Sequence, residues 1–167
     1  MKQSMAIISL LCIGCTQTES KSDIVPSAGT YTMTPIELDN QCGPAYDIED
    51  FDSLPPSIVD IDVHLEAKQL SITFDNEYNE MYILELEDNV ATYDLIINQY
   101  WSADQTFVIT QEQVMYFKWS SPSISYGYVG VNVRCDGECP SSAPEFGVEN
   151  VPCTSNLVSS LEMGESQ

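Results

Sequence analysis

Basic residues are scarce in this chain of 167 residues. Five Lys and Arg residues stand against 26 Asp and Glu residues, which gives a formal net charge of −21 at pH 7. Proteins that bind nucleic acid neutralise its phosphates with Lys and Arg, so this charge excludes DNA and RNA as partners. With a single His in the chain, acid–base chemistry near neutral pH has one natural candidate, His64.

A long apolar run is also lacking at the N-terminus, where Lys2 precedes the short apolar stretch of residues 6–13 and Gly14 follows it. A membrane-spanning helix needs about 20 apolar residues, so this stretch is too short to span. A basic residue, an apolar stretch and a small residue in this order are typical of a secretory signal that is removed. We therefore expect residues 1–14 to be a signal peptide.

The segment Leu11-Cys12-Ile13-Gly14-Cys15 resembles the lipobox of bacterial lipoproteins, in which a signal peptidase cuts before a cysteine that then carries lipid. The resemblance departs from the usual pattern in having Cys12 where Leu is commonest. It implies lipidation of Cys15, and Thr16, rather than Asp, at the next position implies sorting to the outer membrane. An ordinary secretory signal is the alternative.

Residues 15–28 then form the lipidated cysteine and a polar tether without periodicity. The expected location is the bacterial cell envelope, with the membrane as a partner through the lipid anchor. Beyond the tether, we expect a β domain over residues 29–153 and a C-terminal tail over residues 154–167, either disordered or forming a short helix over Asn156–Met163.

The β domain is predicted from strict alternation of apolar and polar residues. With a turn centred at Ala67 and Lys68, Leu65 faces Leu70, Val63 faces Ile72 and Ile61 faces Phe74. With a turn at Asp88 and Asn89, Leu86 faces Ala91, Leu84 faces Tyr93 and Tyr82 faces Leu95. A third predicted hairpin turns at Gln111 and Glu112, a long strand runs from Ile124 to Cys135, and a first strand from Gly29 to Thr34 ends at Pro35.

About eight strands joined by short turns predict an all-β antiparallel meander, either a barrel or a sandwich. Gly29-Thr30-Tyr31 is similar to the Gly-x-Trp motif of lipocalins, with Tyr in place of Trp, and residues 36–57 resemble their large first loop. This resemblance favours a barrel and implies an apolar interior for one small ligand.

Four cysteines follow the signal and tether, an even number in an exported chain. Two disulfides are expected to staple the C-terminal tail, with three possible connectivities. The spacing of Cys135-x-x-x-Cys139 also allows a zinc site, but the sequence has no second pair of closely spaced cysteines to complete it. The candidate cysteines are Cys42, Cys135, Cys139 and Cys153.

Three groups of residues are candidates for a site. His64, Ser71 and Asp62 share one polar strand face, which is the composition of a hydrolytic triad and also of any solvated strand face. Oxygen-rich loop residues are candidates for Ca²⁺, and Tyr100 and Trp101, expected between two strands, are candidates for ligand contact. The calcium candidates are Asp47, Glu49, Asp50 and Asp52.

From these features we expect a non-catalytic envelope lipoprotein, without a cofactor, that binds a small ligand or another envelope component. A structural or adhesion module, with or without Ca²⁺, is the alternative. A hydrolase using His64 and Ser71 is the more remote alternative, because no Gly-x-Ser-x-Gly motif is present to expose the serine.

Overall fold

The computed structural model describes residues 24–48 and 51–164. In this part of the chain eight antiparallel strands close into a barrel in sequence order, with β8 pairing back onto β1. The structure confirms the predicted antiparallel meander and resolves the choice between barrel and sandwich in favour of the barrel. The strands are β1 (Gly29–Asn40), β2 (Ser57–His64), β3 (Gln69–Phe74), β4 (Met81–Glu87), β5 (Val90–Trp101), β6 (Phe107–Ser121), β7 (Ile124–Gly137) and β8 (Cys153–Met163).

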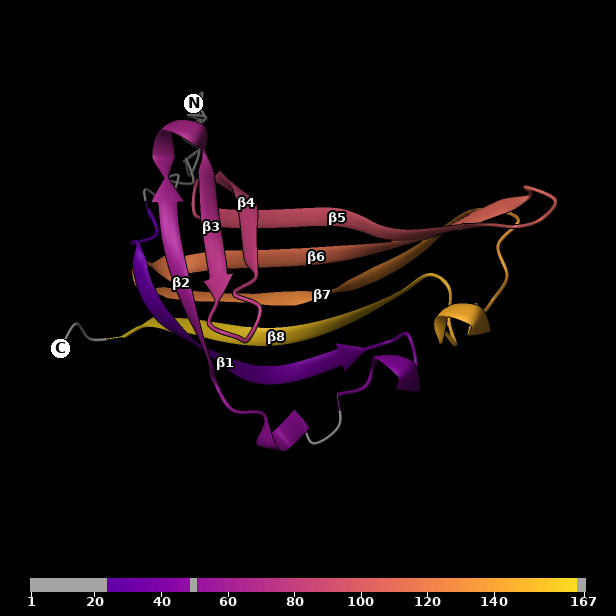
Figure 1. Ribbon diagram of the computed structural model, residues 1–167, viewed down its shortest axis with the longest axis horizontal. Coiled ribbons are helices and arrows are strands. Elements are labelled where there is room, and N and C mark those ends of the chain that lie inside the picture. Colours follow the sequence, from indigo (N-terminus) through magenta and orange to yellow (C-terminus); the bar gives the residue numbers. More distant parts are fainter. Residues whose placement is uncertain (1–23, 49–50, 165–167) are drawn as a thin grey trace, which may run out of the picture.

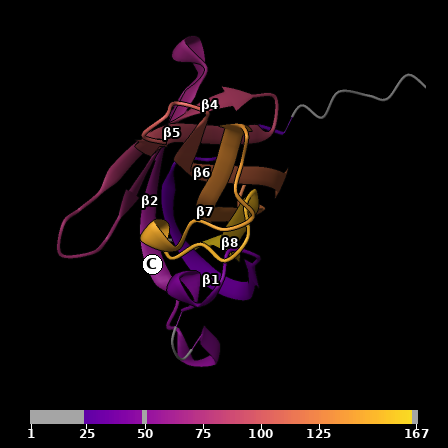
Figure 2. The same cartoon turned by 90° about the vertical axis from the view of Figure 1, so that its right-hand side faces the viewer.

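The strands differ greatly in length, and this difference shapes the molecule. The short strands β2, β3 and β4 run steeply across the long strands and cover only one end of them, while β5, β6 and β7 continue far beyond (Figure 1). Viewed along the long strands, the sheet curls around an enclosed interior (Figure 2). The closed barrel is therefore confined to one end, and an open sheet extends from it.

Large side chains fill the interior of the closed end. Tyr31, Phe117 and Trp119 are each 0% exposed and pack with aliphatic residues from seven of the strands. Burial of such side chains is the main stabilising contribution to a domain of this size. A small-ligand interior, which the lipocalin resemblance implies, would need the space that these rings occupy.

A second, smaller core lies where the loops meet the outer part of the long strands. Ile109 of β6 and Val133 of β7 pack there with Ala143 and Val148 from the segment before β8. A disulfide between Cys42 and Cys153 ties the end of β1 to the start of β8 within this core. The other disulfide joins Cys135 and Cys139 and excludes the zinc alternative at that pair.

The first predicted hairpin has the correct face but the wrong register. Val63 pairs with Leu70 and Ile61 with Ile72, two residues away from the predicted partners. The reason is a connection centred one residue earlier than predicted, a 3-10 turn over Leu65–Ala67 followed by Lys68 in the left-handed conformation. Because side chains alternate along a strand, a shift of two residues keeps the apolar set inside.

The prediction of the second hairpin is confirmed at the turn, but the pairs predicted farther from the turn are wrong. Leu86 pairs with Ala91 as predicted, but pairing between β4 and β5 stops at Glu85 and Thr92. The predicted pairs of Leu84 with Tyr93 and of Tyr82 with Leu95 do not form, because the two strands separate there.

The predicted third hairpin is wrong, because β6 runs without interruption through Gln111 and Glu112. These polar residues have partners in the folded chain: Gln111 Nε2 donates a hydrogen bond to Tyr46 Oη, in the 3-10 turn Pro44–Tyr46, at 2.6 Å, and Glu112 pairs with Arg134 of β7. Their polarity therefore does not mark a turn. The β5–β6 connection instead lies at residues 102–106.

The two ends of the domain also differ from expectation. Residues 153–163 form β8 rather than a helix, since their alternating inward residues, such as Leu161 and Ser159, are buried in the barrel. β1 continues past Pro35 to Asn40, with a bulge between Pro35 and Glu37. Part of the predicted tether is packed: Ser27 N donates to Pro122 O at 2.8 Å, and Tyr31 Oη donates to Ser27 O at 2.8 Å.

Candidate functional site

The candidate site is the outer side of β5, where the strand has no neighbour on one side. β6 pairs with β5 from Val90 to Trp101, whereas β4 pairs with it only from Val90 to Thr92. Within the described residues, no strand pairs with the other side of Tyr93–Gln99, which we call the β5 edge. The backbone groups that point away from β6 along such an edge can pair with another strand.

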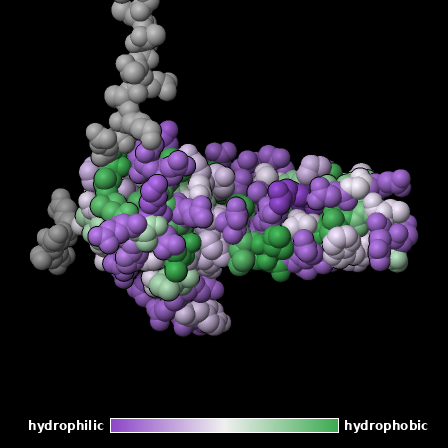
Figure 3. Space-filling model, turned by 90° about the horizontal axis from the view of Figure 1, so that it is seen from above, coloured by the Kyte–Doolittle hydropathy of each residue, from purple (hydrophilic) through white to green (hydrophobic). Residues whose placement is uncertain are grey.

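The middle of the β5 edge exposes three consecutive apolar side chains. Leu95, Ile96 and Ile97 are 50%, 52% and 51% exposed, and Asp94 is the one charged residue of the edge. Seen from the β5 side, hydrophobic patches lie along the extended part of the molecule between hydrophilic groups (Figure 3). In a chain with 26 acidic residues, this nearly uncharged apolar edge is a distinct local feature.

The opposite edge of the same sheet has a different composition. Beyond Met33, β1 also loses its pairing with β2. This stretch, which we call the β1 edge, exposes Ile36, but it also exposes Glu37 and Asp39 and contains the half-buried Pro35. Proline, charge and bulges are the devices by which proteins protect sheet edges from pairing with other chains. The β5 edge has two of these devices, the bulge at Ile97 and the single charge of Asp94, and no proline.

At its inner end the β5 edge begins at a fork where β4 and β5 separate. On the inner face, Phe74, Tyr82 and Tyr93 meet edge to face, with ring centroids 5.8 Å apart for the first pair and 5.4 Å for the second. Burial raises the pKa of Tyr93, with smaller contributions from Tyr82 and Asp94. These rings close the barrel interior at the fork.

On the outer face of the fork lies a hollow of about 270 Å³. Glu85 of β4 and Asp94 of β5 line it, together with Ile83, Thr92 and Tyr93. Neither carboxylate forms an ion pair with a described residue; the cation of Arg134 is held by Glu112. The fork therefore presents two carboxylates beside an apolar strand edge.

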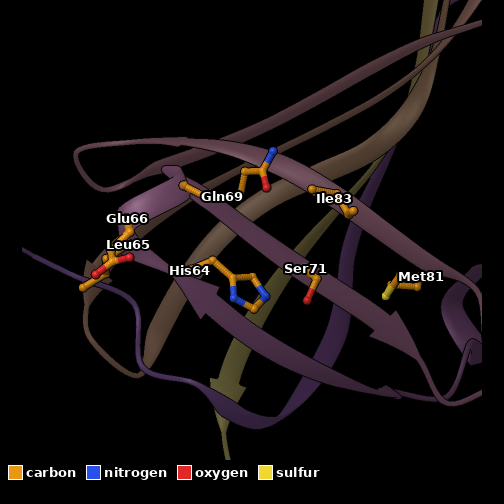
Figure 4. Close-up of a pocket in the computed structure, with 8 residues that line it drawn as sticks. His64, Leu65, Glu66, Gln69, Ser71, Met81 and Ile83 are labelled. Atoms are coloured by element: carbon orange, nitrogen blue, oxygen red, sulfur yellow. The ribbon is translucent and has the colours of Figure 1, made fainter.

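A second hollow, of about 650 Å³, surrounds His64 on the outer face of β2, β3 and β4 (Figure 4). Leu65, Met81 and Ile83 are more than half exposed around it. The register places Ser71 opposite Asp62 and His64 opposite Gln69, so the predicted triad residues are neighbours. Within the described residues no hydrogen bond joins the three side chains, and such bonds are what a triad needs.

The prediction that Tyr100 and Trp101 lie between two strands is wrong. They are the last two residues of β5. Trp101 is 60% exposed, and the ring of Tyr100 lies 6.3 Å from that of Phe107. The two residues thus extend the apolar surface of the β5 edge toward the tip of the sheet.

The lipidation candidate and the calcium candidates lie outside the described residues or close to the gap at residues 49–50. Cys15, Glu49 and Asp50 lie outside the described residues. Asp47 accepts a hydrogen bond from Asn40 Nδ2, and Asp52 lies in a 3-10 turn. Among the described residues, His, Cys, Asp and Glu side chains nowhere gather in groups of three that could hold a metal ion. No helix in residues 24–48 and 51–164 is long and apolar enough to cross a membrane.

Sequence reasoning missed the β5 edge and the fork. The available signal was the run Leu95-Ile96-Ile97, three apolar residues in a row where strict alternation should place one on the polar face. Such a run marks either a bulge or an exposed apolar surface, and here it marks both.

Comparisons with known proteins give no relative for this chain. No protein-family model matches it, and no curated protein or solved structure is significantly similar to it.

Proposed function

We propose that this protein is an exported, lipid-anchored barrel that acts by contact with another protein, with the β5 edge as its contact surface. The observation that carries the proposal is the exposed, nearly uncharged backbone edge over Tyr93–Gln99. Extended segments bind to such edges by adding a strand, with backbone hydrogen bonds providing affinity and side chains providing specificity.

The contrast between the two edges of the open sheet supports this role. On the β1 edge the exposed Ile36 stands between Pro35 and Glu37, whereas the β5 edge leaves three consecutive apolar residues, Leu95, Ile96 and Ile97, facing solvent. Exposed apolar strand edges are an aggregation hazard unless a partner covers them. A partner that covers the β5 edge best explains why an acidic, exported domain keeps three consecutive apolar residues exposed there.

The filled barrel interior favours contact at the surface over an internal ligand. The anchor is proposed from the lipobox-like segment ending at Cys15. Lipid on Cys15 would hold the barrel at the envelope membrane, where its partner is expected.

Site-specific photo-crosslinking in intact cells tests the contact surface. A photoreactive residue replaces Ile97 on the β5 edge in one variant and Asp39 on the β1 edge in the matched control. We expect a covalent adduct of defined mass from position 97 and none from position 39. Equal adducts from both positions, or none from position 97, would contradict the proposal.

A further inference from the structure

The side chains at the fork define what kind of segment the β5 edge accepts, an inference that rests on the proposed function. Glu85 and Asp94 line one hollow on the outer face, and neither has a cationic partner among the described residues. A strand added to β5 would pass directly beside them, because Asp94 belongs to the edge itself. A Lys or Arg side chain is the group that complements this position.

The charge of the whole chain favours the same kind of occupant. At −21, a second copy of the protein would be repelled as it approached, whereas a basic segment would be attracted. A strand paired to β5 would lie about 5 Å from it, so Asp94 on β5 would act on that strand from within the screening length of about 8 Å. Charge complementarity thus favours a basic partner over self-association.

The apolar residues of the edge define the rest of the segment. Leu95 lies opposite Gln113 on the inner face of the sheet and Ile96 opposite Glu112 on the outer face. A paired strand would place successive side chains beside each of them in turn. The bulge at Ile97 interrupts the register, so continuous pairing is confined to Tyr93–Ile96.

We infer that β5 accepts a short, extended, net-basic segment of another protein, which pairs with Tyr93–Ile96 and places a Lys or Arg side chain between Glu85 and Asp94. The segment would carry apolar side chains against Leu95 and Ile96. The occupant is therefore a peptide strand with a cationic end rather than a small molecule.

Synthetic peptides binding to the full-length protein test this inference. The first probe is a capped peptide of alternating valine and threonine with lysine at both ends. The second has glutamate at both ends, and the third is the lysine peptide with every backbone amide methylated, so that neither of its edges can donate the hydrogen bonds of a paired strand. The protein variants are Glu85→Gln with Asp94→Asn and, as a matched control, Glu37→Gln with Asp39→Asn on the β1 edge. Circular dichroism checks that each variant keeps its strands.

We expect the lysine peptide to bind, and its affinity to fall about tenfold in the fork variant and to stay unchanged in the control. The glutamate peptide should bind more weakly than the lysine peptide, and added salt should reduce that difference. Equal binding of both peptides, or an unaffected fork variant, would overturn the basic occupant while leaving strand addition intact.

Other outcomes would contradict strand addition itself or the identity of the occupant. Equal binding of the methylated and unmodified lysine peptides would overturn strand addition and with it the proposed function. Failure of the lysine peptide to bind, with sedimentation showing a dimer that Ile96→Lys dissociates, would assign the β5 edge to a second copy. Failure to bind in a monomeric protein would overturn the inferred occupant, while the crosslinking experiment would still test the contact surface.

Discussion

The ring of Tyr82 meets that of Tyr93 edge to face, 5.4 Å between centroids, just where backbone pairing between β4 and β5 ends. The contact replaces the hydrogen bonds that would otherwise continue between the two strands. It closes the barrel on the inside while leaving the β5 backbone uncovered on its other side. The same pair of residues therefore completes the core and begins the candidate binding edge.

The two disulfides should differ in their contribution to stability. Cys42 and Cys153 are separated by 111 residues, and Cys135 and Cys139 by four. Because a longer closed loop restricts the unfolded chain more, replacing the first pair by alanine should lower the free energy of unfolding by about 4 to 5 kcal/mol, and the second by about 2 kcal/mol. Urea unfolding of both double variants measures this, and equal losses would argue against the loop explanation.

Tyr31 should make stability depend on pH in the alkaline range. Burial raises the pKa of its phenol above the ordinary value of 10.0. The folded state therefore favours the neutral phenol, and this contribution is present below pH 10 and lost as the pH rises further. The difference in unfolding free energy between wild type and Tyr31→Phe should shrink or reverse above pH 10.

At neutral pH, Tyr31→Phe should destabilise the protein by about 1 kcal/mol, because the phenol donates to the carbonyls of Ser27 and Pro122. Chemical unfolding at a series of pH values measures both effects. Tyr126→Phe, at a half-exposed outer position, is the control and should leave the profile unchanged. A Tyr31→Phe profile parallel to wild type at all pH values would contradict the role of burial.

The proposed lipid anchor makes a separate prediction at the N-terminus. Cys15→Ser should move the protein from the membrane fraction to the soluble fraction, because a peptide tether without lipid has no strong affinity for the bilayer. Cys12→Ser is the matched control and should remain in the membrane fraction. Fractionation of cells followed by immunoblotting measures this, and membrane retention of Cys15→Ser would contradict lipidation at that residue.

The sequence predicted the class of the fold well because alternation survives errors of register. Shifting the first hairpin by two residues kept Val63 and Ile61 inside, so the apolar face was correct although the partners were not. The number of strands was also correct, but through two compensating errors. Splitting β6 at Gln111 added one strand, and reading Asn156–Met163 as a helix removed another.

The candidate site was harder to predict because it depends on where two strands stop pairing. Local patterns continue from Leu84 to Tyr82 and from Tyr93 to Leu95 as if the hairpin were regular. The separation arises from the tertiary arrangement, in which β4 runs steeply across β5 to close the barrel (Figure 1). The polar residues Gln111 and Glu112 in β6 led to the wrong prediction of a turn for a similar reason. Their partners, Tyr46 and Arg134, are distant in sequence, so a local pattern does not reveal them.

Amide hydrogen exchange along β5 tests the central claim most directly. Full-length protein recovered from its own membrane with bound partners is compared with the same protein produced alone. In the isolated protein, the amides of residues 93–96 that point away from β6 should exchange rapidly, and in the recovered complex they should be strongly protected. Rapid exchange in both preparations would mean that nothing covers this side of β5 in the cell, and would contradict the account.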